Sequence, residues 1–328
     1  MPSFNHQLRR TLGSSDLEVS PVALGTWPIA GVATRDVNNR DSVATIRACL
    51  DLGINFIDTA YCYGPNGESE NLIRQALEGQ RDRVVLATKG GIHYGSDGVQ
   101  TQDARPETLI RECDQSLRRL GTDRIDLYYL HSPDPQVPVA ESAGAIRDLI
   151  NAGKVRCAGA SNCHLEQLQA FNAACPLTAV QLPYNMLQRD IQQQTIPWCQ
   201  ENNVSLVVYW ALMKGLLAGR LTREDQLDEN DSRRKYPMYQ GEEWNKNQAF
   251  LNILRDIAAE ANRTVAQVVV NWTIHQSGVT VALCGAKRRW QLEETADAMG
   301  WQLSSAQHKQ IEQAIAARGK AAAKRVFR

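Results

Sequence analysis

The chain has 328 residues, and its 36 Lys and Arg residues balance its 36 Asp and Glu residues, so the formal net charge is zero. This balance removes the electrostatic argument for a nucleic-acid partner or an anionic membrane surface. Hydrophobic residues make up 43% of the chain, which is enough for a large core, but no apolar run is long enough to span a bilayer.

The cysteines and the amino-terminal segment indicate the compartment. The eight cysteines are scattered, with no CxxC pair and no metal-ligand spacing. We therefore expect reduced, mostly buried thiols and no metal site. The first six residues lack the basic-then-apolar profile of a secretory signal. The sequence predicts a cytoplasmic protein.

Strand-like and helix-like segments alternate along the chain after a predicted hairpin at 7–20, whose turn lies at 13–16. Short apolar runs, typical of buried parallel strands, lie at 22–24, 55–58, 84–89, 126–131, 157–161, 179–182, 205–209 and 280–283. Helical patterns lie at 42–52, 68–77, 106–120, 139–151, 165–174, 191–202, 247–261 and 265–275. A last helix begins near Ser304 or Ser305 and runs into the basic tail 320–328.

Eight strand-then-helix units without a composition break predict one (β/α)8 TIM barrel over residues 1–328. The amino-terminal hairpin and the carboxyl-terminal helix are additions to this barrel. A doubly wound sheet is less favoured, because no GxGxxG follows the first strand. The long polar segment 210–245 is interpreted as a functional loop over the barrel mouth.

Three of the predicted strands end on an ionisable residue, namely Asp58, Lys89 and His131. A charge is costly inside a buried strand, but the carboxyl ends of barrel strands open into the loops that build active sites. Tyr61 and Tyr63 follow in the loop after Asp58. A lysine ammonium at ~4 Å, at an effective dielectric of about 20, favours the phenolate by roughly 4 kcal/mol, or about three pKa units. The set predicts a proton-transfer site.

Several segments, in chain order, resemble the signature of the aldo-keto reductase superfamily. The run Gly-Ile-Asn-Phe-Ile-Asp-Thr-Ala-Tyr-Cys-Tyr-Gly at 53–64 is followed by Ser69 and Glu70. Further similar segments are 88–89, 126–131, 159–162, 181–185 and 285–287. The resemblance extends from about residue 8 to about residue 300, and the motifs are specific when taken together.

The resemblance implies hydride transfer between NADP(H) and the carbonyl or alcohol carbon of a small aldehyde, ketone or sugar. By motif position, Tyr63 is the general acid in reduction and the base in the reverse direction, with Lys89 and Asp58 lowering its pKa. His131 hydrogen-bonds the substrate oxygen. Tyr61 is a competing acid, but the family pattern places the catalytic tyrosine directly before the glycine, which favours Tyr63.

The resemblance also implies positions that bind the cofactor. Ser161, Asn162 and Gln181 hold the carboxamide, and Tyr209 stacks on the nicotinamide ring. The other implied contacts lie in the loops after strands one, seven and eight and in the helix that follows: Gly25, Thr26, Trp27, Trp210, Leu212, Gly215, Leu217, Gly285, Ala286, Lys287, Gln291, Glu294 and Thr295.

Lys287, helped by Arg288 or Arg289, is expected to pair with a 2′-phosphate, so NADP is favoured over NAD. Two departures from the family pattern affect this site. Trp210, followed by alanine, stands where relatives usually carry Ser–Pro, which removes a hydroxyl contact and narrows the pocket. Thr295 stands where an adenine-contacting asparagine is common.

The substrate wall is expected to include Tyr63 and His131 together with Trp27, His93 and Trp210. Tyr94 and Tyr239 are further candidates for this wall. The sequence leaves the substrate, the physiological direction and the oligomeric state open, because the acid in one direction is the base in the other.

Two other functions stay open. One is a cofactor-binding regulatory subunit of the potassium-channel β type with negligible turnover, against which the complete catalytic set argues. The other treats Lys89 as the Schiff-base lysine of a barrel aldolase. Under that interpretation the cofactor-binding elements have no role, so it ranks below the reductase.

The same residues also have structural interpretations. Each charged strand end could form an ion pair, and Ser161 with Asn162 could cap the fifth helix. Residues 287–289 could be a solvated helix end, and Trp27 and Trp210 could be packing residues. Cys62, beside the proposed acid, is expected to be an inert thiol.

Overall fold

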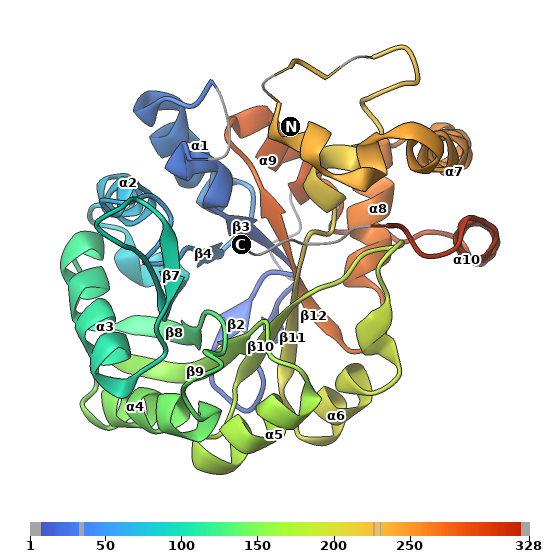
Figure 1. The fold of residues 1–328 in the computed structure, drawn as a ribbon. Coiled ribbons are helices and arrows are strands. Elements are labelled where there is room, and N and C mark those ends of the chain that lie inside the picture. The colour runs from blue at the N-terminus through green and yellow to red at the C-terminus, as the bar shows by residue number, and fades with distance from the viewer. Residues whose placement is uncertain (1–7, 33–35, 226, 230, 323–328) are drawn as a thin grey trace.

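The computed structural model of the chain describes residues 8–32, 36–225, 227–229 and 231–322. Eight parallel strands form a closed barrel, and helices surround it (Figure 1). The barrel strands are β3 (Val22–Gly25), β4 (Phe56–Asp58), β5 (Val85–Gly90), β8 (Ile125–Leu130), β9 (Val155–Ser161), β10 (Ala179–Pro183), β11 (Ser205–Tyr209) and β12 (Val279–Gly285). The predicted (β/α)8 barrel is confirmed.

The helices around the barrel are α1 (Asn39–Asp51), α2 (Glu68–Ala76), α3 (Pro106–Leu120), α4 (Val139–Asn151), α5 (Leu165–Ala174), α6 (Thr195–Glu201), α7 (Gly241–Glu260), α8 (Val265–Ile274), α9 (Arg289–Ala296) and α10 (Ser305–Arg318). Pro106 is the first residue of α3, and Gly121 ends this helix with φ 64°. None of the helices in the described residues is long and apolar enough to cross a membrane.

The amino-terminal hairpin closes one end of the barrel. Its strands β1 (Arg10–Thr11) and β2 (Glu18–Val19) pair antiparallel, which confirms the predicted hairpin apart from residue 7, outside the described residues. Leu12 and Leu17 are buried in the same apolar cluster as Phe56 and other side chains inside the barrel. Because the hairpin fills the amino end, a ligand has access from the carboxyl ends of the strands.

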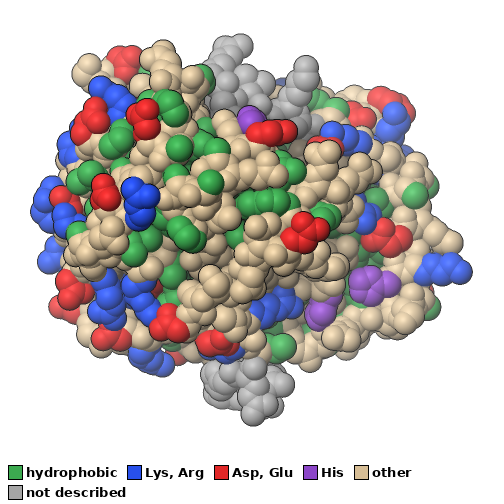
Figure 2. Space-filling view, turned by 90° about the horizontal axis from the view of Figure 1, so that it is seen from below, with side chains coloured by type: hydrophobic (Ala, Val, Ile, Leu, Met, Phe, Trp, Pro, Cys, Tyr) green, Lys and Arg blue, Asp and Glu red, His purple; other side chains and the backbone are tan. Residues whose placement is uncertain are grey.

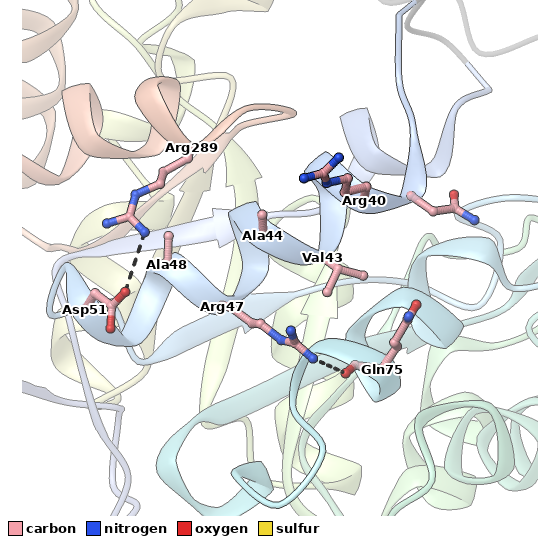
Figure 3. A pocket seen from close by; sticks show the side chains of 9 residues that line it. Arg40, Val43, Ala44, Arg47, Ala48, Asp51, Gln75 and Arg289 are labelled. Carbon is pink, nitrogen blue, oxygen red and sulfur yellow. Dashed lines mark hydrogen bonds and ion pairs between the residues drawn. The ribbon is translucent and has the colours of Figure 1, made fainter.

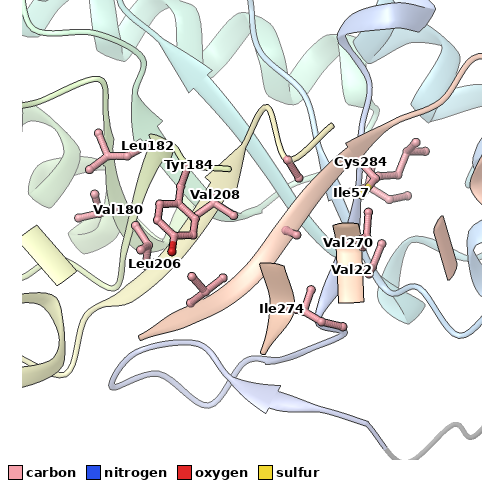
Figure 4. Close-up of a cluster of buried hydrophobic side chains, with 14 of the residues drawn as sticks. Val22, Ile57, Val180, Leu182, Tyr184, Leu206, Val208, Val270, Ile274 and Cys284 are labelled. Atoms are coloured by element: carbon pink, nitrogen blue, oxygen red, sulfur yellow. The ribbon is translucent and has the colours of Figure 1, made fainter. Parts of the chain in front are cut away.

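Two apolar layers lie on opposite sides of the barrel wall. Along β10, Ala179 belongs to the inner cluster, whereas Val180 and Leu182 belong to the larger cluster between strands and helices. Figure 4 shows part of this outer layer, where Val270 and Ile274 of α8 lie among the strand side chains. This alternation explains why the strands read as continuous apolar runs.

The second half of the chain departs from the predicted helix boundaries. In place of one helix at 191–202, a 3-10 turn η3 (Asp190–Gln192) precedes α6. Pro197 accounts for the break, because α6 begins at Thr195 and proline is tolerated only in the first turn. Helix α10 ends at Arg318 before Gly319, so it does not run into the tail, and residues 323–328 lie outside the described residues.

The predicted loop 210–245 contains more regular structure than expected. It holds the 3-10 helices η4 (Met213–Ala218), η5 (Ser232–Lys235) and η6 (Pro237–Tyr239). Helix α7 then begins at Gly241 rather than at Asn247. Glu242 and Glu243 lie in its first turn, where acidic residues are favourable to the helix dipole.

A second hairpin, absent from the prediction, follows β5 directly. Its strands β6 (Ile92–Tyr94) and β7 (Gln100–Gln102) pair antiparallel. The pair Asp97–Gly98 in its turn is a hairpin signal that could have revealed it. This hairpin extends the loop after Lys89 at the carboxyl end of the barrel.

Charges of both signs are intermixed on the face shown in Figure 2, as the zero formal charge suggests. Large hydrophobic side chains that are exposed in the described residues are Leu8, Val32, Val99 and Trp290. So short a set of exposed hydrophobic side chains is typical of an ordinary protein surface.

Candidate active site

Asp58 and Lys89 form a buried ion pair inside the carboxyl end of the barrel. The Lys89 Nζ lies 2.6 Å from Asp58 Oδ1, and each residue is 1% exposed. The same ammonium donates to the Thr59 carbonyl at 2.6 Å, and Gln181 Nε2 donates to Asp58 Oδ2 at 2.8 Å. Burial disfavours the cation, but the attraction of Asp58 prevails and raises the pKa of Lys89. Lys89 is therefore charged at neutral pH.

Tyr63 brings its hydroxyl to this ion pair. Lys89 Nζ donates to Tyr63 Oη at 3.4 Å and lies 4.9 Å from the centre of the phenol ring. The loop is held by the Ser69 amide, which donates to the Tyr63 carbonyl at 3.2 Å. The tight turn after Tyr63 requires Gly64, whose φ is 94°.

The pKa of Tyr63 differs from the sequence-based expectation. Burial of the hydroxyl raises the pKa to about 12, because the loss of hydration outweighs the attraction of Lys89 for the phenolate. Asp58 adds to the rise, since a second negative charge beside it is unfavourable. The predicted fall of about three units is therefore wrong for the protein alone.

Tyr61, the competing acid, points away from the ion pair. Its hydroxyl donates to Gln115 Oε1 on α3 at 2.5 Å, and the Arg119 guanidinium lies 4.2 Å from the centre of its ring. The side chain is thus directed toward the helices rather than into the barrel. The geometry favours Tyr63 over Tyr61.

Trp27 and His131 flank the phenol of Tyr63. Trp27, in the 3-10 turn η1 (Trp27–Ala30), meets the Tyr63 ring edge-on at a centroid distance of 5.0 Å. The His131 ring lies 6.0 Å from the Tyr63 ring. His131 Nδ1 is 3.5 Å from Cys62 Sγ, and burial raises the pKa of this thiol to about 12. The protonated thiol fits the inert role expected of Cys62.

His93, predicted as a substrate contact, lies on β6 with its ring against α3. Its Nδ1 lies 2.9 Å from Glu112 Oε1 on α3. Residues alternate in β6, so Ile92 and Tyr94 face the opposite side and pack in a cluster with Tyr63. Tyr94 is therefore the better candidate for the substrate wall.

Four polar residues predicted to hold the nicotinamide form one network. Tyr209 Oη donates to Asn162 Oδ1 at 2.7 Å, and Asn162 Nδ2 donates to Ser161 Oγ at 3.1 Å. Ser161 Oγ donates to the Gln181 carbonyl at 3.0 Å, and the Gln181 side chain leads to Asp58. Ser161 and Asn162 do not cap α5, because its N-cap residue is His164.

The segment after β11 adopts an unusual backbone. Trp210, Met213 and Lys214 have φ values of 63°, 46° and 55°, and Gly215 has φ 90°. The amides of Met213, Gly215 and Leu217 donate to the carbonyls of Trp210 and Leu212 at 2.7 to 3.1 Å, so these N–H groups close turns within the segment. Two further predicted contacts lie in this segment. Leu217 is buried, and Leu212 is half-buried.

Trp210 packs among aromatic rings in place of the usual serine. Its indole meets Tyr209 and Tyr236 edge-on at centroid distances of 6.3 Å and 6.2 Å. Lys214 Nζ lies 5.5 Å from the centre of the indole and 4.7 Å from that of Tyr236. Sequence reasoning missed Tyr236, because it lies far along the chain in a segment interpreted only as a loop.

The predicted positions near the adenosine half lie around the start of α9. Gln291 Oε1 accepts from the Lys287 and Arg288 amides at 2.9 Å and 3.2 Å, so it shapes this turn. Arg288 pairs with Asp41 at 3.2 Å. Arg289 lies 2.7 Å from Glu293, so the protein's own acids neutralise both arginines.

The remaining positions are Gly25, Thr26, Gly285, Ala286, Glu294 and Thr295. Gly25 and Gly285 pair in register between β3 and β12, which places them at the same edge. Thr26 donates to the Asp58 carbonyl at 2.8 Å, and Glu294 pairs with Arg220 at 2.8 Å. The Thr295 hydroxyl donates to the Gln291 carbonyl of its own helix at 3.2 Å, so it does not replace an amide side chain.

A surface groove of about 600 Å³ lies elsewhere, on the outer faces of α1, α2 and α9 (Figure 3). It is lined by side chains such as Arg40, Arg47 and Arg289 rather than by strand ends. Arg289 and Asp51 meet across it at 3.6 Å. The groove is therefore separate from the candidate active site.

Comparison with known proteins decides the family. The model of the Aldo/keto reductase family matches residues 21–316. The chain belongs to this family. "Aldo-keto reductase YhdN" of Bacillus subtilis (strain 168) is 36% identical over 304 residues, covering 92% of this chain and 91% of that protein. "Probable aldo-keto reductase 1" of Glycine max is 30% identical, over 93% and 88% of the two chains.

Solved structures of aldo-keto reductases share the fold. The glycerol dehydrogenase AKR11B4 from Gluconobacter oxydans has a TM-score of 0.89 and 33% identity, with 99% of both chains covered. An aldo/keto reductase from Klebsiella pneumoniae, solved with NADP and acetate, has a TM-score of 0.73 and 28% identity over 96% and 99% of the chains. Membership of the family makes this aldo-keto reductase an NAD(P)H-dependent enzyme of carbonyl reduction.

Proposed function

We propose that this aldo-keto reductase interconverts a small aldehyde, ketone or sugar with its alcohol, using NADP(H), and that Tyr63 transfers the proton. The observation that supports this proposal is the position of Lys89, which contacts both Asp58 at 2.6 Å and Tyr63 at 3.4 Å. A cation fixed beside a phenol stabilises the phenolate that forms as the proton leaves.

Each residue of the site has its own role in the proposed reaction. Tyr63 donates its proton to the carbonyl oxygen in reduction and accepts it in oxidation. His131 hydrogen-bonds that oxygen and orients the carbonyl, and Trp27, Tyr94 and Trp210 form the substrate wall. The bound nicotinamide supplies or accepts the hydride.

The cofactor assignment rests on the polar network and on the loops around it. Ser161, Asn162 and Gln181 would hold the carboxamide, and Tyr209 would lie against the ring. The segment 212–217 would cover the pyrophosphate, where Gly215, with φ 90°, lets the backbone approach a phosphate closely. Lys287 would pair with the 2′-phosphate. The relative solved with NADP supports the choice of NADP(H) over NAD(H).

The Schiff-base alternative fits the contacts of Lys89 poorly. A nucleophilic lysine must lose its proton, but here Asp58 and the Thr59 carbonyl both accept from the ammonium at 2.6 Å. The raised pKa of Lys89 also keeps the amine protonated.

Steady-state turnover on a panel of aldehydes, ketones, sugars and polyols, with NADPH and NADH, tests the proposal. We expect turnover on at least one class, faster with NADPH at low cofactor concentration. Background rates on every compound, with intact NADPH binding, would favour the regulatory-subunit alternative instead.

A further inference from the structure

One buried carboxylate of the signature segment has no part in the proton transfer described above. Glu70 lies on α2 and is 0% exposed. An ionised carboxylate at such a position loses its hydration and needs protein partners to replace it. Burial raises the pKa of this carboxyl, whereas hydrogen bonds from Ser116, Thr88 and Arg119 lower it. Thr88 and Arg119 connect Glu70 to the strand of Lys89 and to the loop of Tyr63.

The first connection runs through Thr88 to the strand of Lys89. Thr88 Oγ1 donates to Glu70 Oε1 at 2.8 Å, and both side chains are buried. Thr88 and Lys89 are neighbours on β5, so their side chains point to opposite faces of the barrel wall. Glu70 therefore fixes the outer face of the strand at the residue before Lys89.

The second connection runs through Arg119 to the loop of Tyr63. Arg119 on α3 lies 3.3 Å from Glu70 Oε2, and its Nη1 donates to the Tyr61 carbonyl at 3.1 Å. At the other end of the loop, a Cβ on Gly67 would lie 2.5 Å from Arg119 Cδ, so the arginine runs along that backbone. Arg119 thus contacts the loop on both sides of Tyr63.

We propose that Glu70 is a positioning residue that sets the separation of Lys89 and Tyr63, acting through Thr88 and Arg119. The inference rests on the proposed function. Charge attraction falls with distance, so any increase in the 3.4 Å separation of Lys89 Nζ and Tyr63 Oη weakens the stabilisation of the phenolate. A displacement of about 1 Å would cost about one pKa unit at Tyr63, which is a tenfold change in phenolate formation.

The decisive variant is Glu70→Gln, which preserves shape but replaces the carboxyl oxygen that contacts Arg119 at 3.3 Å with an amide group. We expect kcat to fall about tenfold while the dissociation constant for NADPH changes less than twofold. The solvent deuterium isotope effect on kcat should increase, because proton transfer becomes slower. A role in folding alone would leave that isotope effect unchanged.

Two substitutions at the other end of the network test the same contact without removing a buried charge. Thr88→Val deletes only the hydroxyl that Glu70 accepts from and should lower kcat, whereas Thr88→Ser keeps it and should restore kcat. These variants also decide the question if Glu70→Gln does not fold.

The control is Glu312→Gln on α10, in a Glu–Arg pair that is more exposed than that of Glu70. Glu312 pairs with Arg189 at 2.6 Å, so the control removes a Glu–Arg pair on the opposite side of the barrel. It should lower the melting temperature and leave both kcat and the isotope effect unchanged.

The outcomes separate this inference from the proposed function. Wild-type kcat and isotope effect in Glu70→Gln, or in Thr88→Val if the first variant is unfolded, would overturn the positioning role alone. A wild-type enzyme without turnover on the carbonyl panel would overturn the proposed function, and the positioning role with it.

Discussion

At Lys89, two opposing effects meet. Burial removes water from the ammonium group, whereas Asp58 and the Thr59 carbonyl supply close acceptors. The acceptors prevail, so the cation persists where a lone lysine would lose its proton. At Tyr63 the loss of hydration outweighs the attraction of Lys89 for the phenolate, so the phenol stays protonated in the protein alone.

The raised pKa of Tyr63 predicts the pH dependence of both directions. With a pKa of about 12, the phenol that donates in reduction stays protonated through neutral pH, so the rate of reduction should not fall there. The phenolate needed for alcohol oxidation increases about tenfold per pH unit below the pKa. We expect log kcat for oxidation to rise with pH up to 10, and a plateau below pH 9 would contradict it.

Lys287 gives a prediction about cofactor choice. Lys287→Ala should raise the KM for NADPH about tenfold or more and leave the KM for NADH nearly unchanged, because only NADPH carries the 2′-phosphate. Steady-state kinetics with both cofactors check this result. Lys309→Ala on α10 serves as the control, and equal effects on both cofactors in Lys287→Ala would show that no 2′-phosphate is bound there.

Among the elements, the loop between β4 and α2 depends on one glycine. Gly64 has φ 94°, and a Cβ there would lie 2.0 Å from Glu68 Oε2. That carboxylate accepts from the Asn66 amide at 2.9 Å, so moving it aside would loosen the loop that carries Tyr63.

We therefore expect Gly64→Ala to lower the free energy of unfolding by about 2 kcal/mol and to reduce kcat. Gly79→Ala is the matched control, because Gly79 has φ 72° but open space around its Cα. The control should cost about 1 kcal/mol and leave kcat unchanged. Equal losses of kcat in the two variants, measured beside urea denaturation, would show that the loop is not the cause.

Sequence patterns predicted elements better than their ends. Helix α3 matches its predicted bounds, because Pro106 and Gly121 mark both ends. Helix α7 was predicted to begin at Asn247 but begins at Gly241, where neither a proline nor a capping side chain marks the start. The hairpin after β5 was missed because each of its strands has only three residues, although Asp97–Gly98 marks its turn.

Side-chain direction was the harder problem. The apolar run that stops on Lys89 placed this residue near the end of its strand, but His93 lies in a short hairpin whose register was unknown. The pKa of Tyr63 also depends on burial of its hydroxyl, which no spacing in the sequence reveals.

At the scale of the whole molecule, the residues that close the amino end of the barrel are distinct from the proton-transfer residues. The hairpin β1–β2 fills the amino end, and the proton-transfer residues lie at the carboxyl end. Substitutions in the hairpin should therefore change stability and leave the chemical step unchanged.

Leu12 offers a test of this separation. The side chain is 0% exposed in the inner cluster, so Leu12→Ala should lower the free energy of unfolding by about 3 kcal/mol. The control Leu8→Ala, at 37% exposed, should cost less than about 0.5 kcal/mol. Urea denaturation and kcat should be measured together, and a large loss of kcat in folded Leu12→Ala would contradict the separation.

The replacement Tyr63→Phe tests the central claim most directly, because it deletes one hydroxyl and leaves the ring. Carbonyl reduction by this variant should fall by at least about a hundredfold, the usual contribution of a general acid, while NADPH titrated against protein fluorescence binds as in the wild type. Reduction at the wild-type rate would contradict the account.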